Sequence, residues 1–350
     1  MSDTLIISVD AMGGDHAPMA VIEGVASVAR KDPSVFFFLY GDENKILPLT
    51  KQFGLASDRF KIHHTTSVVK ADDKPSVAIR SGRESSMWKA IYSVRTGESA
   101  AVVSAGNTGA FMAMSKICLG TIAGLDRPAL AAVMPTSIPK NDVVMLDLGA
   151  NAECDATNLV EFAIMGSLFY SILYQVEKPR VGLLNIGSEE TKGREEIREA
   201  SSVLKEHGEN MDYIGFVEGF DIGAGRAQVV VADGFSGNVA LKSIEGTAKM
   251  IKRILAQSIK SSWLSWLAIP FLLPALMRVK KRVDPRLYNG ALFLGLNGIS
   301  VKSHGGADAF SYARAVETAI RLAENDLCAK IKTELENAIF APQEAELELS

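Results

Sequence analysis

The chain has 350 residues, of which 47% are hydrophobic, so it can bury a large core in one domain or in two tightly joined ones. Its net charge of −4 excludes the strongly basic character that marks many nucleic-acid-binding proteins. The cysteines are Cys118, Cys154 and Cys328. They are widely spaced, which favours a reducing compartment over a disulfide framework or a zinc site.

Short apolar runs alternate with helical patterns along most of the chain, which predicts a mainly parallel sheet covered by helices on both faces. We expect strands at residues 5–9, 35–40, 59–63, 100–103, 143–146, 181–184 and 229–232. We expect helices at residues 18–30, 86–95 and 109–119. Repeats and clear linkers are absent from the sequence, so a single continuous α/β unit is favoured.

Five of the expected strands lead into loops rich in glycine and small polar residues. These loops are residues 10–18, 104–109, 147–151, 185–193 and 233–238. Such loops let backbone N–H groups approach an anion, most often phosphate, at the carboxyl ends of strands. Each loop alone is a weak signal, since a pair such as Gly13–Gly14 is more often a tight turn than a site. Together they predict one crevice for an anionic small molecule.

Lys192 is the strongest single candidate for a role in chemistry. Its ammonium can pair with phosphate or stabilise the oxyanion of an attacked carbonyl. The alternative is a surface ion pair with Glu189 or Glu190. Asn238 can donate a hydrogen bond to the same oxyanion, or it can simply cap a helix that begins at Val239.

Several common catalytic motifs are missing. The sequence has no Walker-type GxxxxGK[ST], no GxSxG and no HExxH. Gly223 and Gly225 begin a dinucleotide fingerprint, but Gln228 stands at the third glycine position. Cys154 lies beside Glu153 and Asp155, which raise a thiol pKa and make a poor nucleophile. We therefore expect an enzyme without a covalent intermediate, acting on phosphate and a carbonyl substrate through positioning and electrostatics.

The segment 243–283 is an excursion from this pattern. Apolar residues recur at helical spacing from Ile244 to Ile259, and an apolar run broken by two prolines follows at 263–277. From residue 242 to 282 there are nine Lys or Arg and one acid. The run is shorter than the roughly 20 residues of a bilayer span. One interpretation is a helical hairpin buried in a core or dimer interface. The other is an interfacial membrane anchor, and both can hold on different faces. The anchor would make contact through Trp263, Leu264, Trp266, Leu267, Phe271 and Leu272.

Six strings of the sequence together resemble the bacterial phosphate acyltransferases of phospholipid synthesis, the PlsX family. They are VDAMGGDHAP (9–18), SAGNTGA (104–110), LDLGAN (146–151), NIGSEETKG (185–193), DGFSGNVALKSIEG (233–246) and KSHGGAD (302–308). The resemblance implies transfer of a long-chain acyl group from acyl carrier protein to inorganic phosphate, giving acyl phosphate. It also implies a three-layer α/β/α sandwich similar to phosphotransacetylase and isopropylmalate dehydrogenase.

The resemblance further implies a homodimer that lies on the inner face of the cytoplasmic membrane through a helical hairpin, contacts anionic lipid and serves a glycerol-3-phosphate acyltransferase. Lys192 and Asn238 match the catalytic lysine and asparagine of the family. The phosphate and pantetheine end of the crevice would be lined by Asp10, Gly13, Gly14, His16, Asn107, Thr108, Ser188 and His304. Ser236 departs from the threonine of many relatives.

Phosphate would attack the thioester directly, because a thiolate with a pKa near 8.5 leaves without a strong general acid. We expect no cofactor, no metal and no nucleic-acid partner. Residues 1–330 would form one domain with the hairpin 243–283, followed by an acidic tail at 331–350. The alternatives are a phosphotransacetylase-like enzyme that uses acyl-CoA, a NAD-dependent dehydrogenase of related fold, and a membrane-docked scaffold without catalysis.

Overall fold

A single mixed sheet organises the molecule. The computed structural model describes residues 4–207, 211–260, 271–275, 277–279 and 282–340. The sheet has eleven strands in the order β3-β2-β1-β4-β11-β10-β5-β6-β9-β7-β8. They are β1 (Ile6–Asp10), β2 (Phe36–Gly41), β3 (Phe60–His64), β4 (Ala101–Ser104), β5 (Ala129–Met134), β6 (Val143–Leu146), β7 (Arg180–Leu184), β8 (Asp212–Val217), β9 (Val229–Val231), β10 (Ala291–Leu294) and β11 (Ile299–Lys302). Strands β4, β6 and β9 are buried along their whole length, as expected for strands covered on both faces.

The sheet consists of two parallel halves that point in opposite directions. Strands β3, β2, β1, β4 and β11 are parallel to one another, and so are β6, β9, β7 and β8. Between them, β11–β10, β10–β5 and β5–β6 pair antiparallel. The carboxyl ends of β1, β4 and β11 therefore leave one edge of the sheet, and those of β6, β9 and β7 leave the opposite edge.

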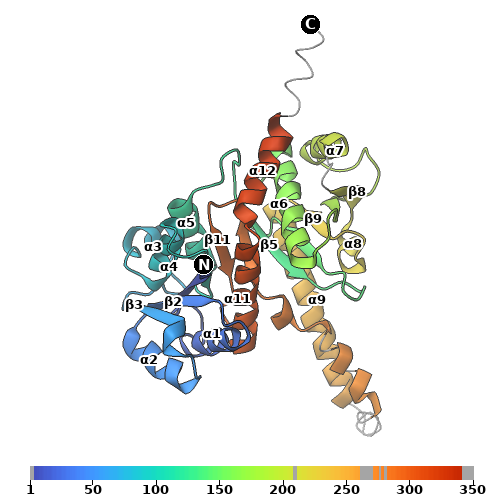
Figure 1. Ribbon diagram of the computed structural model, residues 1–350. Coiled ribbons are helices and arrows are strands. Elements are labelled where there is room, and N and C mark those ends of the chain that lie inside the picture. The colour runs from blue at the N-terminus through green and yellow to red at the C-terminus, as the bar shows by residue number, and fades with distance from the viewer. Residues whose placement is uncertain (1–3, 208–210, 261–270, 276, 280–281, 341–350) are drawn as a thin grey trace.

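Helices cover both faces, so the fold has three layers (Figure 1). One face packs a continuous core against α1 (Met19–Lys31), α2 (Glu43–Gln52), α6 (Ala156–Tyr174), α7 (Glu195–His207), α11 (Ala309–Glu324) and α12 (Leu327–Phe340). The other face has two separate cores, under α3 (Pro75–Ser81), α4 (Ser86–Arg95) and α5 (Thr108–Leu119), and under α8 (Gly219–Ala224) and α9 (Gly234–Lys260). Two short 3₁₀ turns are η1 (Ser57–Arg59) and η2 (Pro285–Tyr288). The predicted α/β/α sandwich with a mainly parallel sheet is confirmed.

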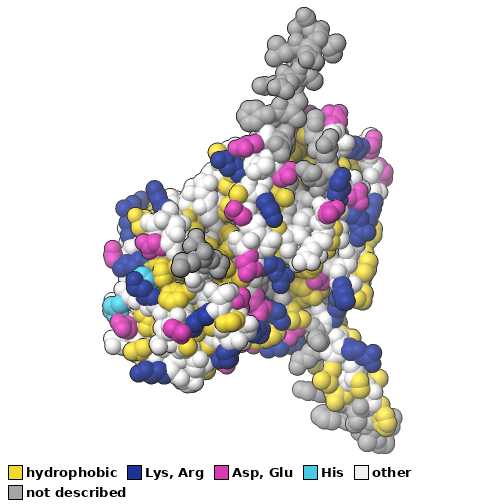
Figure 2. All heavy atoms as spheres, in the orientation of Figure 1, with side chains coloured by type: hydrophobic (Ala, Val, Ile, Leu, Met, Phe, Trp, Pro, Cys, Tyr) yellow, Lys and Arg dark blue, Asp and Glu magenta, His cyan; other side chains and the backbone are white. Residues whose placement is uncertain are grey.

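Helix α9 carries the predicted excursion and projects from the body as an arm (Figure 1). Its 27 residues begin at Gly234, before the predicted start at 243, and span about 40 Å at 1.5 Å per residue. Residues 271–275 and 277–279 are helical as well. Apolar side chains interspersed with basic ones cover the visible part of the arm (Figure 2). Phe271 and Leu272 are 87% and 54% exposed, whereas Trp263, Leu264, Trp266 and Leu267 lie outside the described residues.

Two further segments bear on the domain organisation. Within the described part of the chain, α6 alone is long and apolar enough to cross a membrane, but 61% of it is buried and it belongs to the main core. Residues 331–340, which we expected in the tail, continue α12. Ile331 and Leu335 of this segment are buried in the same core.

Candidate functional site

The glycine-rich loops divide into two groups, because the strands that carry them point in opposite directions. The first loop group comprises residues 10–18, 104–109 and 302–308, after β1, β4 and β11. The second loop group comprises residues 147–151, 185–193 and 233–238, after β6, β7 and β9. The described residues show no side-chain hydrogen bond or ion pair between the groups. A single crevice would require all these strands to end at the same edge of the sheet. Because the two halves run in opposite directions, the strands of the two groups end at opposite edges.

The second loop group brings Lys192 and Asn238 to neighbouring strands. Asn185 donates a hydrogen bond from its amide to the Lys192 carbonyl oxygen at 3.1 Å, which closes the loop after β7. Arg194, directly after that loop, forms an ion pair with the buried Asp233 at the start of the loop after β9. A Cβ atom on Gly149 would lie 3.6 Å from the Cβ of Asn238, so the loop after β6 also lies against this asparagine.

The Lys192 side chain is exposed and makes no ion pair within the described residues. The alternative of a surface ion pair is wrong, because Glu190 pairs with Lys205 instead. Ser188 is exposed in the same loop. An ammonium held at a strand end without a protein partner can serve an incoming oxyanion.

Asn238 is not a helix cap. Helix α9 begins at Gly234, and Asp233 caps it by accepting hydrogen bonds from the Ser236 N–H at 2.8 Å and the Ser236 hydroxyl at 2.9 Å. Asn238 lies in the second turn and is exposed. One turn further on, Lys242 pairs with Glu245 at 3.0 Å. The Asn238 side chain makes no hydrogen bond within the described residues, and it belongs to the loop next to that of Lys192.

Asp147 belongs to the second loop group and Cys154 lies against it at Asn151, but neither is placed or ionised as a nucleophile requires. Asp147 is fully buried and accepts main-chain hydrogen bonds from Leu130, Ala150 and Asn151, so it shapes the loop after β6. Burial raises the pKa of the Cys154 thiol to about 11, and the Asp147 carboxylate adds to the effect. The predicted direction is confirmed, although burial is its main cause rather than the flanking acids. A thiol with this pKa is protonated at neutral pH.

The first loop group is built around the buried carboxylate of Asp10. Its oxygens accept hydrogen bonds from Ser86 Oγ at 2.6 Å and Ser104 Oγ at 2.7 Å. Burial raises the pKa of Asp10, and the two hydroxyl donors oppose the shift. A Cβ on Gly13 would collide with Asp10 and approach the Gly106 nitrogen to 2.7 Å, so only glycine lets these loops close together.

Lys302, at the end of β11, is a residue of this group that the sequence interpretation missed. Its side chain is only 6% exposed, and its ammonium donates to the Ser303 carbonyl oxygen. Asp10 and Asp15 lie close enough to act on its charge. The signal was present in the sequence, because a lysine ends the apolar run Ile299–Lys302 inside one of the quoted strings.

The other predicted residues of this group differ in what they do. Asn107 caps α5 through Ala110 N–H at 3.0 Å, and its amide holds the 70–73 segment by donating to the Ala71 and Asp73 carbonyls, both at 2.9 Å. His304 is exposed, and its Nδ1 accepts from Gly306 N–H at 3.0 Å. His16 and Thr108 are exposed at the starts of α1 and α5. Gly14 adopts φ +110°, where a side chain would be strained.

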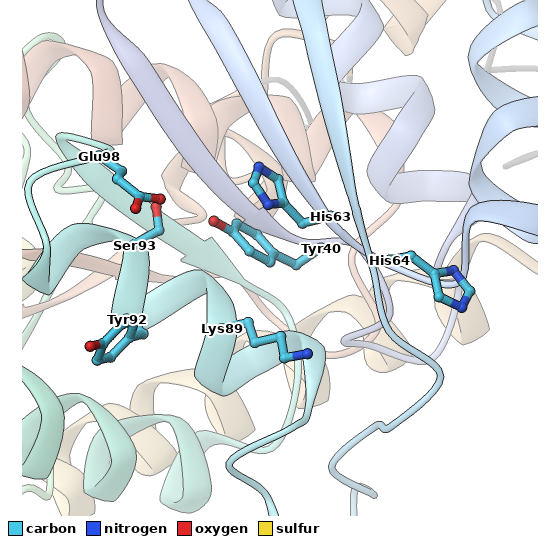
Figure 3. A pocket seen from close by; sticks show the side chains of 7 residues that line it. All are labelled: Tyr40, His63, His64, Lys89, Tyr92, Ser93 and Glu98. Atoms are coloured by element: carbon cyan, nitrogen blue, oxygen red, sulfur yellow. The ribbon is translucent and has the colours of Figure 1, made fainter.

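A cavity of about 290 Å³ lies outside both groups, between α4 and the ends of β2 and β3. Tyr40 stacks on His63 with ring centroids 4.7 Å apart, and its hydroxyl points toward Ser93 and Glu98, while His64 points away (Figure 3). None of the predicted site residues lines it. Searched over the described residues, the chain has no group of three His, Cys, Asp or Glu side chains that could hold a metal.

Solved structures of phosphotransacylases share this architecture. A phosphotransacetylase from Streptococcus pyogenes superposes with a TM-score of 0.63, covers 93% of this chain and 95% of its own, and is 14% identical. EutD phosphotransacetylase from Staphylococcus aureus gives a TM-score of 0.58 over 92% of this chain and 94% of its own, also at 14% identity. At this identity the likeness defines the class of fold.

Sequence similarity defines the family. The family model described as fatty acid synthesis protein matches residues 5–330. The phosphate acyltransferase of Rhodospirillum rubrum is 50% identical over 342 residues, which are 98% of this chain and 97% of that protein. The phosphate acyltransferase of Paramagnetospirillum magneticum is 47% identical over 96% of this chain and 95% of its own. The chain therefore belongs to the phosphate acyltransferase family of fatty acid synthesis proteins.

Proposed function

We propose that this protein transfers a long-chain acyl group from acyl carrier protein to inorganic phosphate and releases acyl phosphate for phospholipid synthesis. The acyl transfer to phosphate is supported by the names of relatives that align over almost the whole chain. The observation that carries the mechanism is the placement of the exposed, unpaired Lys192 and of Asn238 in loops after neighbouring strands, joined by the Arg194–Asp233 ion pair.

In the proposed reaction a phosphate oxygen attacks the thioester carbonyl carbon. The carbon–sulfur bond breaks, and the thiolate takes the proton that hydrogen phosphate carried. Lys192 offsets the negative charge that develops at the carbonyl oxygen, and Asn238 orients either that oxygen or the phosphate. The poorly ionised Cys154 thiol supports direct attack without an acyl-enzyme.

The protein's partners and location form a second part of the proposal. The exposed Ile251, Ile254 and Leu255 of α9 give two copies an apolar surface for a homodimer. The exposed Phe271 and Leu272 support peripheral contact with the inner face of the cell membrane, where basic residues of the arm meet anionic lipid. The acyl phosphate would then reach a glycerol-3-phosphate acyltransferase at the same membrane.

The test combines purified protein, palmitoyl-acyl carrier protein and inorganic phosphate. We expect phosphate-dependent release of free carrier protein and formation of acyl phosphate. Lys192→Ala should lower kcat by about 100-fold or more, because an oxyanion partner typically contributes that much. Lys45→Ala is the matched control, since Lys45 is an exposed lysine on α2, outside both loop groups.

Three outcomes would contradict parts of the proposal. Near-normal turnover of folded Lys192→Ala would remove Lys192 from the mechanism. Turnover with palmitoyl-CoA but not with the carrier protein would replace the proposed donor with acyl-CoA. No turnover with either donor would contradict the acyltransferase itself.

A further inference from the structure

A buried ammonium in the first loop group has too few hydrogen-bond acceptors. An ammonium carries three N–H donors. Among the described residues, the Ser303 carbonyl oxygen is the one acceptor within reach of Lys302 Nζ, and no carboxylate lies within ion-pair distance. With the side chain 6% exposed, the remaining donors have little access to bulk water. A buried charge left in this state is costly unless another acceptor is bound.

The nearby carboxylates do not form an ion pair with the Lys302 ammonium within the described residues. Asp10 is held by Ser86 and Ser104, and the Met12 N–H also donates to it at 3.3 Å, so three neutral donors satisfy it inside the protein. Asp15 is exposed. Both carboxylates favour the charged form of Lys302, whereas burial opposes it and lowers the lysine pKa to about 8.

The loops around Lys302 meet one another through main-chain contacts. Asp15 N–H donates to the Gly305 carbonyl at 2.8 Å, and a Cβ on Gly14 would approach that same oxygen to 3.1 Å. Glycine at 13, 14, 305 and 306 thus lets these loops approach one another with their main-chain groups uncovered by side chains of their own. A tetrahedral oxyanion with several acceptor atoms suits an ammonium that lacks acceptors and lies among glycine-rich loops.

We infer that Lys302 is the cation of a phosphate-binding site in the first loop group, separate from the Lys192–Asn238 pair of the second. The inference rests on the proposed function for the source of the ligand, which is either inorganic phosphate or the phosphodiester of the carrier's phosphopantetheine arm. Both present the same oxyanion to the same ammonium.

The experiment measures binding without acyl transfer. Inorganic phosphate is titrated into wild-type protein, Lys302→Met, Lys302→Arg and the control Lys45→Met by calorimetry, after unfolding curves show that each is folded. Lys45 is an exposed lysine on α2. We expect Lys302→Met to weaken phosphate binding by about tenfold or more, because a charge-assisted hydrogen bond is lost. Lys302→Arg should bind, and Lys45→Met should match wild type.

A second arm distinguishes the source of the phosphate group. Holo and apo acyl carrier proteins are titrated into the same variants, since they differ by the phosphopantetheine arm. Loss of the preference for holo carrier in Lys302→Met, with inorganic phosphate binding unchanged, would assign the phosphodiester. If folded Lys302→Met binds both inorganic phosphate and holo carrier protein as tightly as wild type does, the inference is overturned.

The pH dependence of binding provides a test that can be made even if Lys302→Met does not fold. The lysine loses its charge as the pH rises through about 8, whereas arginine keeps its charge. Phosphate or holo-carrier binding should weaken across that range in wild type and stay level in Lys302→Arg. The same decline in both proteins overturns the inference. If binding follows these expectations but no acyl transfer occurs, the proposed function fails and the phosphate site stands.

Discussion

The buried carboxylates of this protein accept hydrogen bonds from different kinds of donor, and these donors determine what each carboxylate does for the structure. Asp10 and Asp147 both lie at strand ends, and burial raises the pKa of each. Asp10 accepts from two serine hydroxyls, whereas Asp147 accepts mainly from main-chain N–H groups. Both acids therefore shape loops that carry polar groups outward, and neither faces a substrate as a free base. Glu161 on α6 has less support, because the Asp126 N–H and the Asn158 side chain stabilise its carboxylate but its Oε2 has no partner.

Glu161 should make the stability of the protein depend on pH. Burial raises its pKa from 4.5 to about 7, with Asp126 and Asp155 adding to the shift. Between these values the folded state keeps a proton that the unfolded state releases, so the free energy of unfolding falls as the pH rises through this window. Glu161→Gln should remove this slope and be up to about 3 kcal/mol more stable than wild type at pH 8. Urea unfolding at pH 5 and pH 8 measures the free energy of unfolding of both proteins. The same change in this free energy between the two pH values in wild type and Glu161→Gln would contradict the prediction.

At the scale of elements, the start of α9 is seated on the loop after β6. Gly234 N–H donates to the Asn151 carbonyl at 2.8 Å. A Cβ on Gly237 would collide with the Asp147 carbonyl oxygen and lie 3.1 Å from its carbon. The glycines of this turn thus allow the helix to approach the loop closely, and this contact fixes the position of Asn238.

Gly237→Ala should therefore displace the first turn of α9. We expect a loss of about 1–3 kcal/mol in the free energy of unfolding from overpacking, together with a large fall in kcat because Asn238 moves. Gly246→Ala is the control in the same helix, since a Cβ there meets nothing within 4 Å. It should be neutral or stabilise the helix by up to about 1 kcal/mol. Equal stability and activity in the two variants would show that the α9 contact does not position Asn238.

Sequence patterns located seven of the eleven strands but not the direction of the two halves of the sheet. Seven strands were predicted to within one residue at each end, because their apolar runs stand out from polar surroundings. Strands β5, β8, β10 and β11 were not predicted. Even where an apolar run such as Ala291–Leu294 is recognised as a strand, it carries no sign of its direction, so the antiparallel pairing of β10 and β5 could not be foreseen. The division into two loop groups follows from those two strands. The structural role of Asn107 was also not visible in the sequence. The carbonyl groups to which its amide donates lie 34 and 36 residues earlier in the chain, so no local pattern marks these hydrogen bonds.

For the whole molecule, the arm connects the two loop groups. Helix α9 begins in the second group with Asn238, and the chain returns from the arm through η2 to Asn289. The Asn289 amide donates to Ser303 Oγ at 2.7 Å, and its Oδ1 accepts from His304 N–H at 2.9 Å, both in the first group. Arg282 also ties the returning segment to the body by donating to the Thr136 carbonyl at 3.0 Å. One protruding segment therefore has its two ends anchored at opposite edges of the sheet.

The end of this arm should hold the protein on membranes. Phe271→Ser with Leu272→Ser removes two exposed apolar side chains, each of which stabilises a buried state by about 1.5–3 kcal/mol. We expect at least about 100-fold weaker co-sedimentation with phosphatidylglycerol-containing vesicles. The matched control is Ile254→Ser with Leu255→Ser, which removes two exposed apolar side chains of α9 instead. This variant should shift the dimer toward monomer in sedimentation analysis. Undiminished vesicle binding of the Phe271 and Leu272 variant would contradict the anchor. Loss of vesicle binding in the α9 pair alone would instead place the membrane contact on the shaft of the arm.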